Sequence, residues 1–309
     1  MKRVEMRMNQ ELGKKLLSIL KEEQVKKDEP MKSHTTFRVG GPADYFVTPQ
    51  TAEEVAKVIE ACTQEKVPYY IVGNGSNLLV SDKGYEGVII QIYKQMNQVK
   101  VEGAQIHAQA GALLSMIAKR ALDAELTGFE FAAGIPGTLG GACVMNAGAY
   151  GGTISDVLLY ARVITKENGI LELTPEELEL GYRTSNIEKN GYIVSSVVLK
   201  MKKGNPEEIK ALIADLTEGR KSKQPLEYPS AGSTFKRPEG HFAGQLIDEA
   251  GLRGYQCGGA QISIKHAGFV INTGNATAED VVNVITHAQE EVLKRNNIKL
   301  ETEVKRLGF

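Results

Sequence analysis

Apolar side chains recur every three or four residues in several stretches of the chain, which predicts amphipathic helices. Residues 9–28 show this spacing with lysines and glutamates between the apolar positions, so a surface helix is expected there. Thr51 and Glu54 give the capping-box pattern at the start of another such run, and that helix is expected to end near Lys66. Further helices are expected near 112–124, from Pro206, from Thr277 and, as a short one, from Thr174.

Strands are expected where apolar and polar residues alternate, or where short apolar runs lie between turn residues. The segment from Ile298 to Leu307 alternates apolar with charged residues and predicts a half-buried strand with a charged face. Residues 30–47 are expected to be extended with a break at Gly40-Gly41-Pro42, and the polar segment 217–240 to be an ordered loop. The other expected strands are 69–72, 87–92, 98–102, 105–110, 157–165 and 192–201. This mixture favours an α+β fold over a doubly wound parallel sheet.

Glycine is concentrated in the segment from Gly134 to Gly152, where it fills seven of nineteen positions. A second cluster, Gly73-Asn74-Gly75-Ser76-Asn77, follows the expected strand at 69–72. Glycine weakens helices and strands, so such segments suggest a backbone that turns sharply or lies close to a ligand. Backbone N–H groups in loops of this kind can cradle phosphates, but glycine-rich loops also serve as plain connections. The two clusters alone leave a nucleotide site and a plain connection equally open.

The loop at 73–77 does not match the common nucleotide-binding motifs. A Gly-x-Gly-x-x-Gly pattern starting at Gly73 requires glycine at position 78, where Leu78 stands. The loop also lacks the Gly-Lys-Ser/Thr ending of a P-loop. A cofactor bound by these loops therefore requires a different fold.

Composition is that of an ordinary globular protein. The 309 residues are enough for two or three domains. The 37 basic residues balance 38 acidic ones, so charge gives no argument for nucleic acid or an anionic membrane as a partner. Three cysteines without a C-x-x-C pair, together with scattered histidines, argue against a disulfide framework or a metal site. A cytoplasmic location is expected, since residues 1–15 lack an apolar signal core and no apolar run is long enough to span a membrane.

Six motifs, in order along the chain, resemble one known family. The first three are Ser33-His34-Thr35-Thr36-Phe37-Arg38-Val39-Gly40-Gly41, Val72-Gly73-Asn74-Gly75-Ser76-Asn77-Leu78 and Gly134-Ile135-Pro136-Gly137-Thr138-Leu139-Gly140-Gly141. The later three are Gly181-Tyr182-Arg183-Thr184-Ser185, Ala231-Gly232-Ser233-Thr234-Phe235-Lys236 and Glu303-Val304. The family that they resemble is UDP-N-acetylenolpyruvoylglucosamine reductase, and the similarity runs from about residue 30 to the C-terminus.

The resemblance implies a vanillyl-alcohol-oxidase-type (PCMH-type) FAD-binding domain of two α/β subdomains, and an α+β substrate-binding domain. The expected division is 1–100 for the first FAD subdomain, joined by a C-terminal strand at about 298–309, then 101–203 for the second and 204–297 for the substrate domain. The family reduces an enolpyruvyl ether of UDP-N-acetylglucosamine to a lactyl ether in bacterial peptidoglycan precursor synthesis. It uses noncovalent FAD, with NADPH as co-substrate, and no obligate protein partner is inferred.

The resemblance places the cofactor-binding residues in the glycine-rich loops and at one threonine. They are Thr36, Val72, Gly73, Asn74, Gly75, Ser76, Asn77, Leu78, Gly134, Pro136, Gly137, Thr138, Gly140 and Gly141.

Three further residues are implied to be catalytic. Hydride from the flavin is expected to reach the methylene carbon of the substrate, so that negative charge develops on its carboxylate as an enediolate. Arg183 would stabilise that charge, because a guanidinium matches a carboxylate fork. Ser233 would give a proton to the alpha carbon, and Glu303 would help to polarise the carboxylate. Without the resemblance, these residues would be an ion-paired arginine, a turn serine and a solvated edge charge.

Substrate contacts are expected from Lys223, Lys236 and Arg237, the latter two at the diphosphate. A solvated positive loop stays an alternative for Lys223, which lies in a basic run. Some family members carry a long insertion with a tyrosine lid between the Tyr-Arg and serine motifs. Only residues 184–232 separate Arg183 from Ser233 here, so the chain resembles the shorter, second type of the family and no lid tyrosine is assigned.

Two other functions are compatible with parts of the pattern. A flavin oxidase of the same fold would act on an alcohol and often carries a histidine bonded to the flavin, for which His34 is the one candidate near a cofactor motif. A non-catalytic nucleotide-binding module would not need Arg183, Ser233 and Glu303 together.

Overall fold

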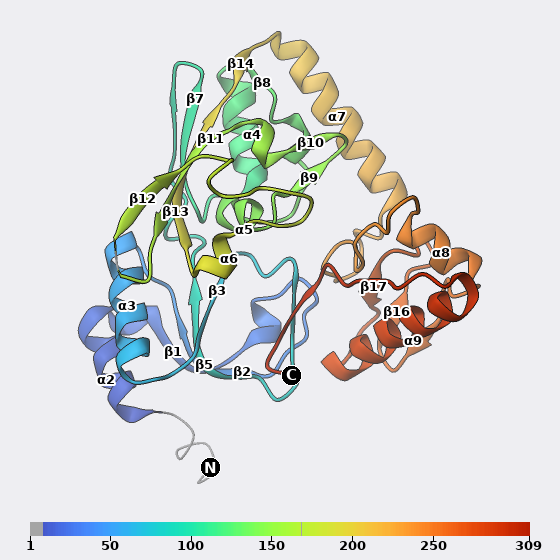
Figure 1. Ribbon diagram of the computed structural model, residues 1–309, viewed down its shortest axis with the longest axis horizontal. Coiled ribbons are helices and arrows are strands. Elements are labelled where there is room, and N and C mark those ends of the chain that lie inside the picture. Colours follow the sequence, from blue (N-terminus) through green and yellow to red (C-terminus); the bar gives the residue numbers. More distant parts are fainter. Residues whose placement is uncertain (1–8, 168) are drawn as a thin grey trace. The chain divides into compact units, whose positions relative to one another are not determined.

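The computed structural model describes residues 9–167 and 169–309, and the chain divides into two compact units (Figure 1). The first unit comprises the chain up to Lys27, residues 45–74 and residues 87–220. The second comprises residues 28–44, 75–86 and 221–309. The division into three domains, expected from the resemblance, stays a prediction.

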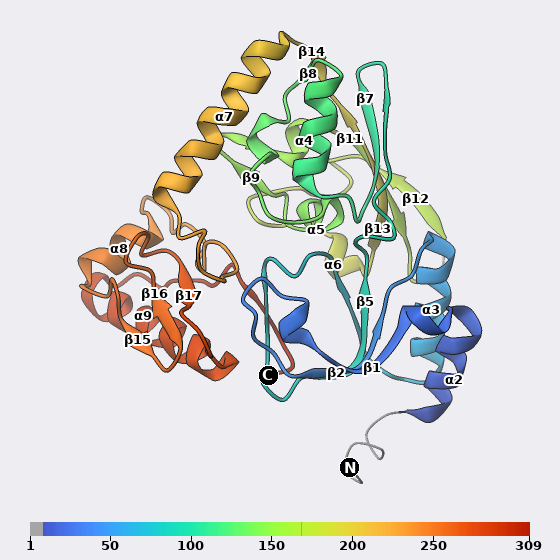
Figure 2. The same ribbon diagram turned by 180° about the vertical axis from the view of Figure 1, so that it is seen from behind.

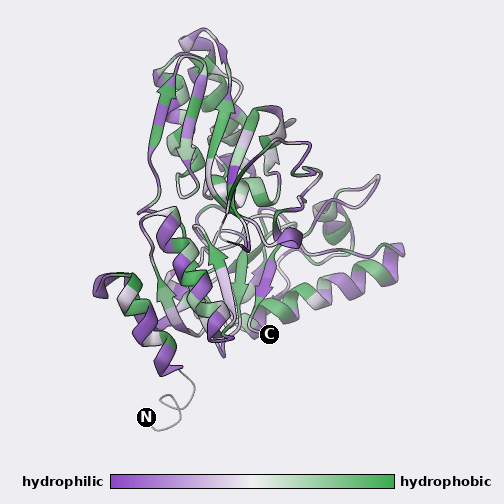
Figure 3. Ribbon diagram, turned by 60° about the vertical axis from the view of Figure 1, so that its left-hand side comes forward, coloured by the Kyte–Doolittle hydropathy of each residue, from purple (hydrophilic) through white to green (hydrophobic). Residues whose placement is uncertain are grey.

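A five-stranded antiparallel sheet with the order β12-β11-β13-β7-β6 forms one half of the first unit. In β7, the buried residues Ile106 and Ala108 alternate with half-buried polar residues, whereas the central strand β13 is buried along most of its length (Figure 3). Helices α4 and α5 contribute Ile117 and Leu139 to the same core. The elements are β6 (Val99–Glu102), β7 (Gln105–Gln109), α4 (Leu114–Asp123), α5 (Leu139–Val144), β11 (Leu158–Ile164), β12 (Ile170–Leu173) and β13 (Ile193–Lys200).

The rest of the first unit is built around the parallel pair β3 and β5. These strands belong to a sheet with the order β1-β2-β5-β3, and helices α2 and α3 contribute Leu12, Leu16 and Val58 to the core of the unit. The elements are α2 (Gln10–Ile19), β1 (Val25–Pro30), β2 (Pro42–Val47), α3 (Ala52–Gln64), β3 (Tyr69–Val72) and β5 (Tyr85–Gln91).

Further short elements lie between these strands and helices along the chain, and one of them, η2, belongs to the second unit. The strand pairs β8 with β14 and β9 with β10 are antiparallel. The elements are η1 (Glu22–Gln24), η2 (Met31–Ser33), β8 (Leu126–Thr127), η3 (Glu130–Ala132), β9 (Gly148–Ala149), β10 (Gly152–Thr153), η4 (Ile154–Asp156), α6 (Ile187–Asn190), β14 (Lys202–Lys203) and α7 (Pro206–Lys223).

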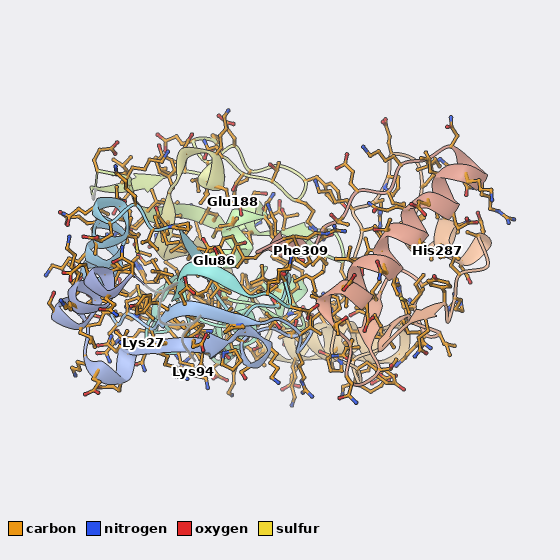
Figure 4. The ribbon with its side chains drawn as sticks, turned by 90° about the horizontal axis from the view of Figure 1, so that it is seen from below. Lys27, Glu86, Lys94, Glu188, His287 and Phe309 are labelled. Atoms are coloured by element: carbon orange, nitrogen blue, oxygen red, sulfur yellow. The ribbon has the colours of Figure 1, made fainter. Side chains whose placement is uncertain are left out.

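The second unit has its own core, in which the apolar side of α9 covers a three-stranded antiparallel sheet (Figure 2). Val281, Ile285 and Ala288 of α9 are fully buried, whereas His287 lies farther out and stacks on Tyr255 at 4.1 Å between ring centres (Figure 4). The elements are β4 (Leu78–Val80), α8 (Ala243–Glu249), β15 (Gln256–Cys257), β16 (Ala260–Ile262), β17 (Val270–Asn272), α9 (Ala278–Asn296) and β18 (Lys305–Leu307). Strand β18 pairs in parallel with β4.

Most predicted helices and strands are confirmed, including both capped helix starts. Thr51 accepts from the N–H of Glu54 at 3.1 Å at the start of α3. At the start of α9, Thr277 and Asp280 exchange bonds of 2.9 and 3.0 Å, which is the full capping box.

Five expectations were wrong in part. The helix expected over 9–28 ends at Ile19, because Leu20 is extended and residues 25–30 form β1. The loop expected over 217–240 begins only after Lys223, where α7 ends. The capping bonds at Thr174 form at 2.8 and 3.3 Å, but only a turn follows. The final segment alternates in burial as expected, yet only residues 305–307 form a strand. Segment 30–47, expected to be extended with a break at Gly40-Gly41-Pro42, also contains the 3₁₀ turn at 31–33, and strand β2 begins at Pro42.

Candidate active site

The start of helix α5 is fixed against the segment that joins β7 to α4. The N–H groups of Leu139 and Gly140 donate to the carbonyl oxygens of Ala112 and Ala110 at 2.9 and 2.8 Å. Thr138, the residue before the helix, forms an antiparallel bridge with Leu113. These two helix N–H groups are therefore already bonded within the protein. They are not available to bind a phosphate, so fewer donors of the glycine-rich segment remain for a ligand.

Several glycines that the resemblance assigns to the cofactor are required by the packing of the protein itself. A Cβ atom on Gly140 would lie 2.9 Å from the Cβ of Ala110. One on Gly73 would collide with Oγ1 of Thr138. Gly75 has a left-handed φ of 63°, and a Cβ there would collide with the carbonyl oxygen of His34. Packing within the protein is therefore sufficient to explain glycine at these three positions, whether or not a ligand approaches them.

Gly141 differs from these three glycines. It is exposed in the first turn of α5, and a Cβ there would meet only Oγ1 of Thr138, at an ordinary distance of 3.7 Å. Space inside the protein therefore does not explain the glycine, whereas close approach of a ligand to the helix start would. Gly134 and Pro136, which precede Gly141 in the same segment, are also exposed.

In the second unit, residues 75–77 are held by two other parts of the chain. Thr36 donates its N–H to the carbonyl oxygen of Gly75 at 3.2 Å. Asn77 donates from Nδ2 to the carbonyl oxygen of Glu303 at 3.1 Å, and its own carbonyl accepts from Lys305 at 3.0 Å. Val72 and Leu78, at either end of the loop, lie in β3 and β4, and the Gly73 carbonyl accepts from Nε2 of Gln91 at 3.1 Å.

The hydroxyl group of Thr36 fits a role in holding a ligand. Its Oγ1 atom is buried and lacks a hydrogen-bond partner within the described part of the chain. A buried hydroxyl without a partner costs free energy, so it calls for a group that the protein does not supply. An FAD molecule carries many acceptors that could take this bond, and the donor set of Thr36, Ser76 and Asn77 suits such a polar cofactor.

The segment that follows Ser233 is fixed from two sides within the second unit. Thr234 is fully buried, its N–H donates to Gly268 at 2.9 Å, and its Oγ1 accepts from Val270 at 3.0 Å. Phe235 is bridged to Thr302 in antiparallel register. Ser233 itself is exposed at the start of this fixed segment. Ser233 is therefore an exposed residue next to a backbone that is fixed by hydrogen bonds.

Glu303 is joined to the same support through its backbone. Its N–H donates to the carbonyl oxygen of Thr234 at 2.8 Å, and its carbonyl accepts from Asn77. The side chain is half-buried and takes no part in these two bonds. The structure therefore brings Ser233 and Glu303 together and joins both to the loop at 75–77.

Arg183 belongs to the first unit. It lies in a turn in which Gly181 and Thr184 exchange backbone hydrogen bonds of 3.1 and 3.4 Å. Its φ of 54° is left-handed, which is uncommon for a residue other than glycine. The guanidinium donates from Nη2 to the carbonyl oxygen of Gly148 at 3.0 Å, and Cζ lies 5.3 Å from the ring centre of Tyr182. The arginine head is thus held in one orientation by backbone and ring contacts.

The three expected substrate-binding residues lie in or near exposed positions of the second unit. Lys223 is exposed and is the last residue of α7, so it does not lie in a loop, and its expected contact with the substrate stays a prediction. Lys236 lies 3.4 Å from Glu301 in an ion pair, and its N–H donates to the carbonyl oxygen of Glu301. Arg237 lies over the ring of Phe242 at 4.4 Å. Neither cation is deeply buried, so both can meet an anionic ligand.

Arg220 and Tyr150 are notable side chains that sequence reasoning did not single out. Arg220, near the end of α7, donates from Nη1 to the carbonyl oxygen of Gly134 and lies 5.7 Å from the ring centre of Tyr150. Burial lowers the pKa of the Arg220 guanidinium. Arg220 stands in the basic run before Lys223, but spacing alone gave no signal for its contact with a segment 86 positions away.

The histidine and cysteine nearest the glycine loops have structural surroundings. Nε2 of His34 lies 2.7 Å from the carboxylate of Glu29, so that ring nitrogen is already engaged. Cys143 in α5 is fully buried, and burial raises the pKa of its thiol to about 12. Among the described residues no group of three or more metal-binding side chains is arranged to hold an ion. No helix in that part of the chain is long and apolar enough to cross a membrane.

Two domain families match most of the chain. One, described as "FAD binding domain", matches residues 43–174. The other, described as "UDP-N-acetylenolpyruvoylglucosamine reductase, C-terminal domain", matches residues 224–307.

Similar proteins agree with these matches. The UDP-N-acetylenolpyruvoylglucosamine reductase of Clostridium perfringens (strain SM101 / Type A) is 52% identical over 303 residues, which cover 97% of this chain and 99% of that protein. A crystal structure of the reductase from Thermus caldophilus matches with a TM-score of 0.79 and 38% identity, over 90% of this chain and 97% of that one. An alkyldihydroxyacetonephosphate synthase matches with a TM-score of 0.50 and 20% identity, over 63% of this chain and 41% of that one, which is a likeness of fold alone.

The fold and the matched domains define an FAD-binding oxidoreductase with a vanillyl-alcohol-oxidase-type FAD domain. The expected fold class is thereby confirmed. The chain belongs to the UDP-N-acetylenolpyruvoylglucosamine reductase family, as the six motifs predicted.

Proposed function

We propose that this protein catalyses the NADPH-driven reduction of the enolpyruvyl ether of UDP-N-acetylglucosamine to UDP-N-acetylmuramate. Family membership supports the overall reaction in peptidoglycan precursor synthesis. The observation that supports its assignment to named residues is the bond between Glu303 and Thr234, which joins the glutamate to the segment that begins at Ser233. The substrate is a cytoplasmic sugar nucleotide in this proposal, and neither nucleic acid, a membrane nor an obligate protein partner takes part.

FAD, held without a covalent bond, supplies hydride chemistry when bound. The residues that hold it are those of the two glycine-rich loops, together with the Thr36 hydroxyl group. Because Nε2 of His34 already lies 2.7 Å from Glu29, a covalent histidine–flavin bond at that nitrogen would first require this contact to break. This favours the reductase over an oxidase with covalently bound flavin.

Arg183 stabilises the negative charge that builds on the substrate carboxylate during reduction. A planar guanidinium can donate two parallel bonds to one carboxylate, which a lysine ammonium cannot do. Its contacts with Gly148 and Tyr182 hold the head in place before the substrate arrives. A donor that is oriented in advance costs little reorganisation when charge develops.

Ser233 gives a proton to the alpha carbon. Addition of hydride at the methylene carbon and of a proton at the alpha carbon together reduce the double bond, so the atoms and electrons balance. A hydroxyl is a weak acid, and a strongly basic carbanion is what makes the transfer possible. The rigid support under Thr234 keeps the Ser233 hydroxyl at a fixed distance from a bound substrate.

Glu303 assists at the substrate carboxylate. A carboxylic acid that stays protonated there can donate a hydrogen bond to the enediolate. Lys236 and Arg237 bind the diphosphate, and Lys223 adds a positive charge at the end of α7.

NADPH and the sugar nucleotide use one site in turn, because the chain carries no second dinucleotide motif. The test is oxidation of NADPH by the purified protein with and without the enolpyruvyl sugar nucleotide. Consumption that requires this substrate, with parallel initial-rate lines, agrees with the proposal. Rapid NADPH oxidation by oxygen alone would favour an oxidase, and no oxidation under either condition would favour a non-catalytic module.

A further inference from the structure

Asn146 is a buried residue to which the motifs gave no role. It follows α5, is only 6% exposed, and has a left-handed φ of 41°. Asparagine is among the few residues that adopt this conformation readily. A buried polar residue needs hydrogen-bond partners, so the contacts of Asn146 indicate its role.

The side-chain amide of Asn146 contacts the turn that carries Arg183. Its Nδ2 donates to the carbonyl oxygen of Gly181 at 3.1 Å. This carbonyl is the one that also accepts the N–H of Thr184 at 3.4 Å and so closes the turn. Of the two hydrogen bonds that the Gly181 carbonyl accepts, the one from Asn146 is therefore the shorter.

The orientation of the Asn146 amide is fixed by a third residue. Ser155 donates its N–H to Oδ1 of Asn146 at 3.0 Å, which assigns the oxygen and nitrogen of the amide. Nδ2 also lies 3.3 Å from the hydroxyl of Ser155. The amide is thus held at its acceptor end and donates at the other.

Residues 146–148 contact both the backbone turn that carries Arg183 and the Arg183 guanidinium. Asn146 binds the backbone of the Arg183 turn, and Gly148, two residues later, accepts from the Arg183 guanidinium at 3.0 Å. Arg183 itself has a left-handed φ of 54°, so its backbone conformation needs support from outside the turn. All of these residues lie in the first unit.

We infer that Asn146 is a positioning residue for Arg183 in the reaction proposed above. It does not touch the reacting atoms. It holds the Gly181 carbonyl, and through it the arginine, in the geometry that stabilises charge on the substrate carboxylate. This inference rests on the proposed role of Arg183.

The test compares Asn146→Asp with Ser155→Ala. Asn146→Asp keeps the acceptor for the Ser155 N–H and removes the donor to Gly181. Ser155→Ala keeps both of these bonds and removes only the contacts of the Ser155 hydroxyl with Asn146 and Thr153. FAD content and the rate of flavin reduction by NADPH are measured first. Reoxidation by the enolpyruvyl substrate is then followed by stopped-flow absorbance. We expect Asn146→Asp to slow reoxidation about tenfold, at unchanged FAD content, and Ser155→Ala to change it less than about twofold.

A double-mutant cycle with Arg183→Lys shows whether the effect passes through the arginine. We expect Asn146→Asp to add almost nothing once Arg183 is lysine. Fully additive effects would overturn the inference, because Asn146 would then act by another route. If Arg183→Lys alone leaves reoxidation unchanged, the proposed role of Arg183 fails, and the inference falls with it.

If Asn146 served only to stabilise the fold, its substitution would reduce FAD content or folding, and a second variant tests this. Asn146→Gly accepts the left-handed φ without strain and also removes the donor. It serves as the second variant if the buried aspartate prevents folding. Loss of FAD or of cooperative unfolding in both variants would assign Asn146 to the fold alone and overturn the inference. A folded, flavin-loaded Asn146→Gly with slow reoxidation supports it.

Discussion

The backbone N–H of Glu303 donates a 2.8 Å hydrogen bond to the carbonyl oxygen of Thr234, the residue after Ser233. Two residues 69 positions apart in the chain are thereby joined through backbone atoms, and this bond uses neither the Ser233 nor the Glu303 side chain. Substitution of either side chain leaves this bond in place. The two groups can therefore be tested one at a time without loss of the frame that supports them.

Glu303→Gln should retain folding and FAD but lose activity. Glutamine has nearly the same shape and keeps the backbone bonds to Thr234 and Asn77. Glutamine can still donate a hydrogen bond, but an amide is a weaker donor than a carboxylic acid, so part of the about 1.5–3 kcal/mol of a bond to a charged group is lost and kcat should fall about 10-fold. Steady-state kinetics and the flavin absorbance measure both quantities. Wild-type turnover would show that the ionisable group of Glu303 is irrelevant to the reaction.

Arg183→Lys should impair turnover far more than flavin binding. The lysine keeps a positive charge but loses the planar fork, so charge on the substrate carboxylate is less stabilised. We expect kcat to fall by about 10²-fold, as when one oriented donor is removed from an active site. Arg162→Lys, in an exposed ion pair with Glu172, is the matched control and should be neutral. Equal activity of the two variants would return Arg183 to an ordinary surface role.

Gly141→Ala and Gly140→Ala should separate ligand approach from internal packing. The new methyl group at 141 meets only Thr138, at 3.7 Å, so the apoprotein should keep its stability while FAD content falls. At 140 the methyl lies 2.9 Å from Ala110, so the apoprotein itself should be destabilised. Thermal unfolding of the apoproteins and the flavin-to-protein absorbance ratio distinguish the two. Full FAD occupancy in Gly141→Ala would remove Gly141 from the cofactor site.

Acid should destabilise the support of Ser233 through His266. Nδ1 of His266 accepts from Gly268 at 3.1 Å, and the Gly268 carbonyl accepts from Thr234. Burial lowers the pKa of His266 below its ordinary value of 6.5. The unfolded chain then binds the proton more readily than the folded one, so stability is present above about pH 6.5 and falls below it.

The measurement for His266 is the urea midpoint at pH 7.5 and pH 5.5. One proton limits the loss to about 1.4 kcal/mol per pH unit, and partial exposure makes it smaller. His266→Asn keeps an acceptor for Gly268 without a titrating group, so its midpoint should depend less on pH. His241→Asn, at an exposed position, should behave as wild type. An unchanged pH dependence in His266→Asn would show that this histidine does not couple pH to stability.

Local patterns predicted the regular elements well because a helix or strand is decided largely by its own residues. The capping box of Thr277 and Asp280 is made as the spacing required. The helix expected over 9–28 was too long because β1 gains its hydrogen bonds from β2, a partner that periodicity in one segment does not reveal. The basic run to Lys223 was taken for a loop, although lysine and arginine are good helix formers.

The motifs predicted which residues form the candidate site, whereas the contacts that support these residues could be seen only in the fold. Ser233 and Glu303 followed from motifs, but Thr36 with its unpartnered hydroxyl gained its physical meaning only from the fold. Asn146 and Arg220 contact Gly181 and Gly134 across 35 and 86 positions of sequence. The sequence near each residue does not predict such contacts, because they depend on how the fold brings distant segments together.

Ser233→Ala is the most direct test of proton donation by Ser233, because stopped-flow absorbance of the flavin separates the two half-reactions. Alanine is smaller and fits the exposed position, so packing should not be disturbed. Flavin reduction by NADPH should stay nearly normal, while reoxidation by the enolpyruvyl substrate should slow by about 10²–10⁴, the usual contribution of a positioned acid. In heavy water the wild-type protein should place solvent deuterium on the alpha carbon. Normal reoxidation in a folded Ser233→Ala with full FAD would contradict the account and leave water or another residue as the proton donor.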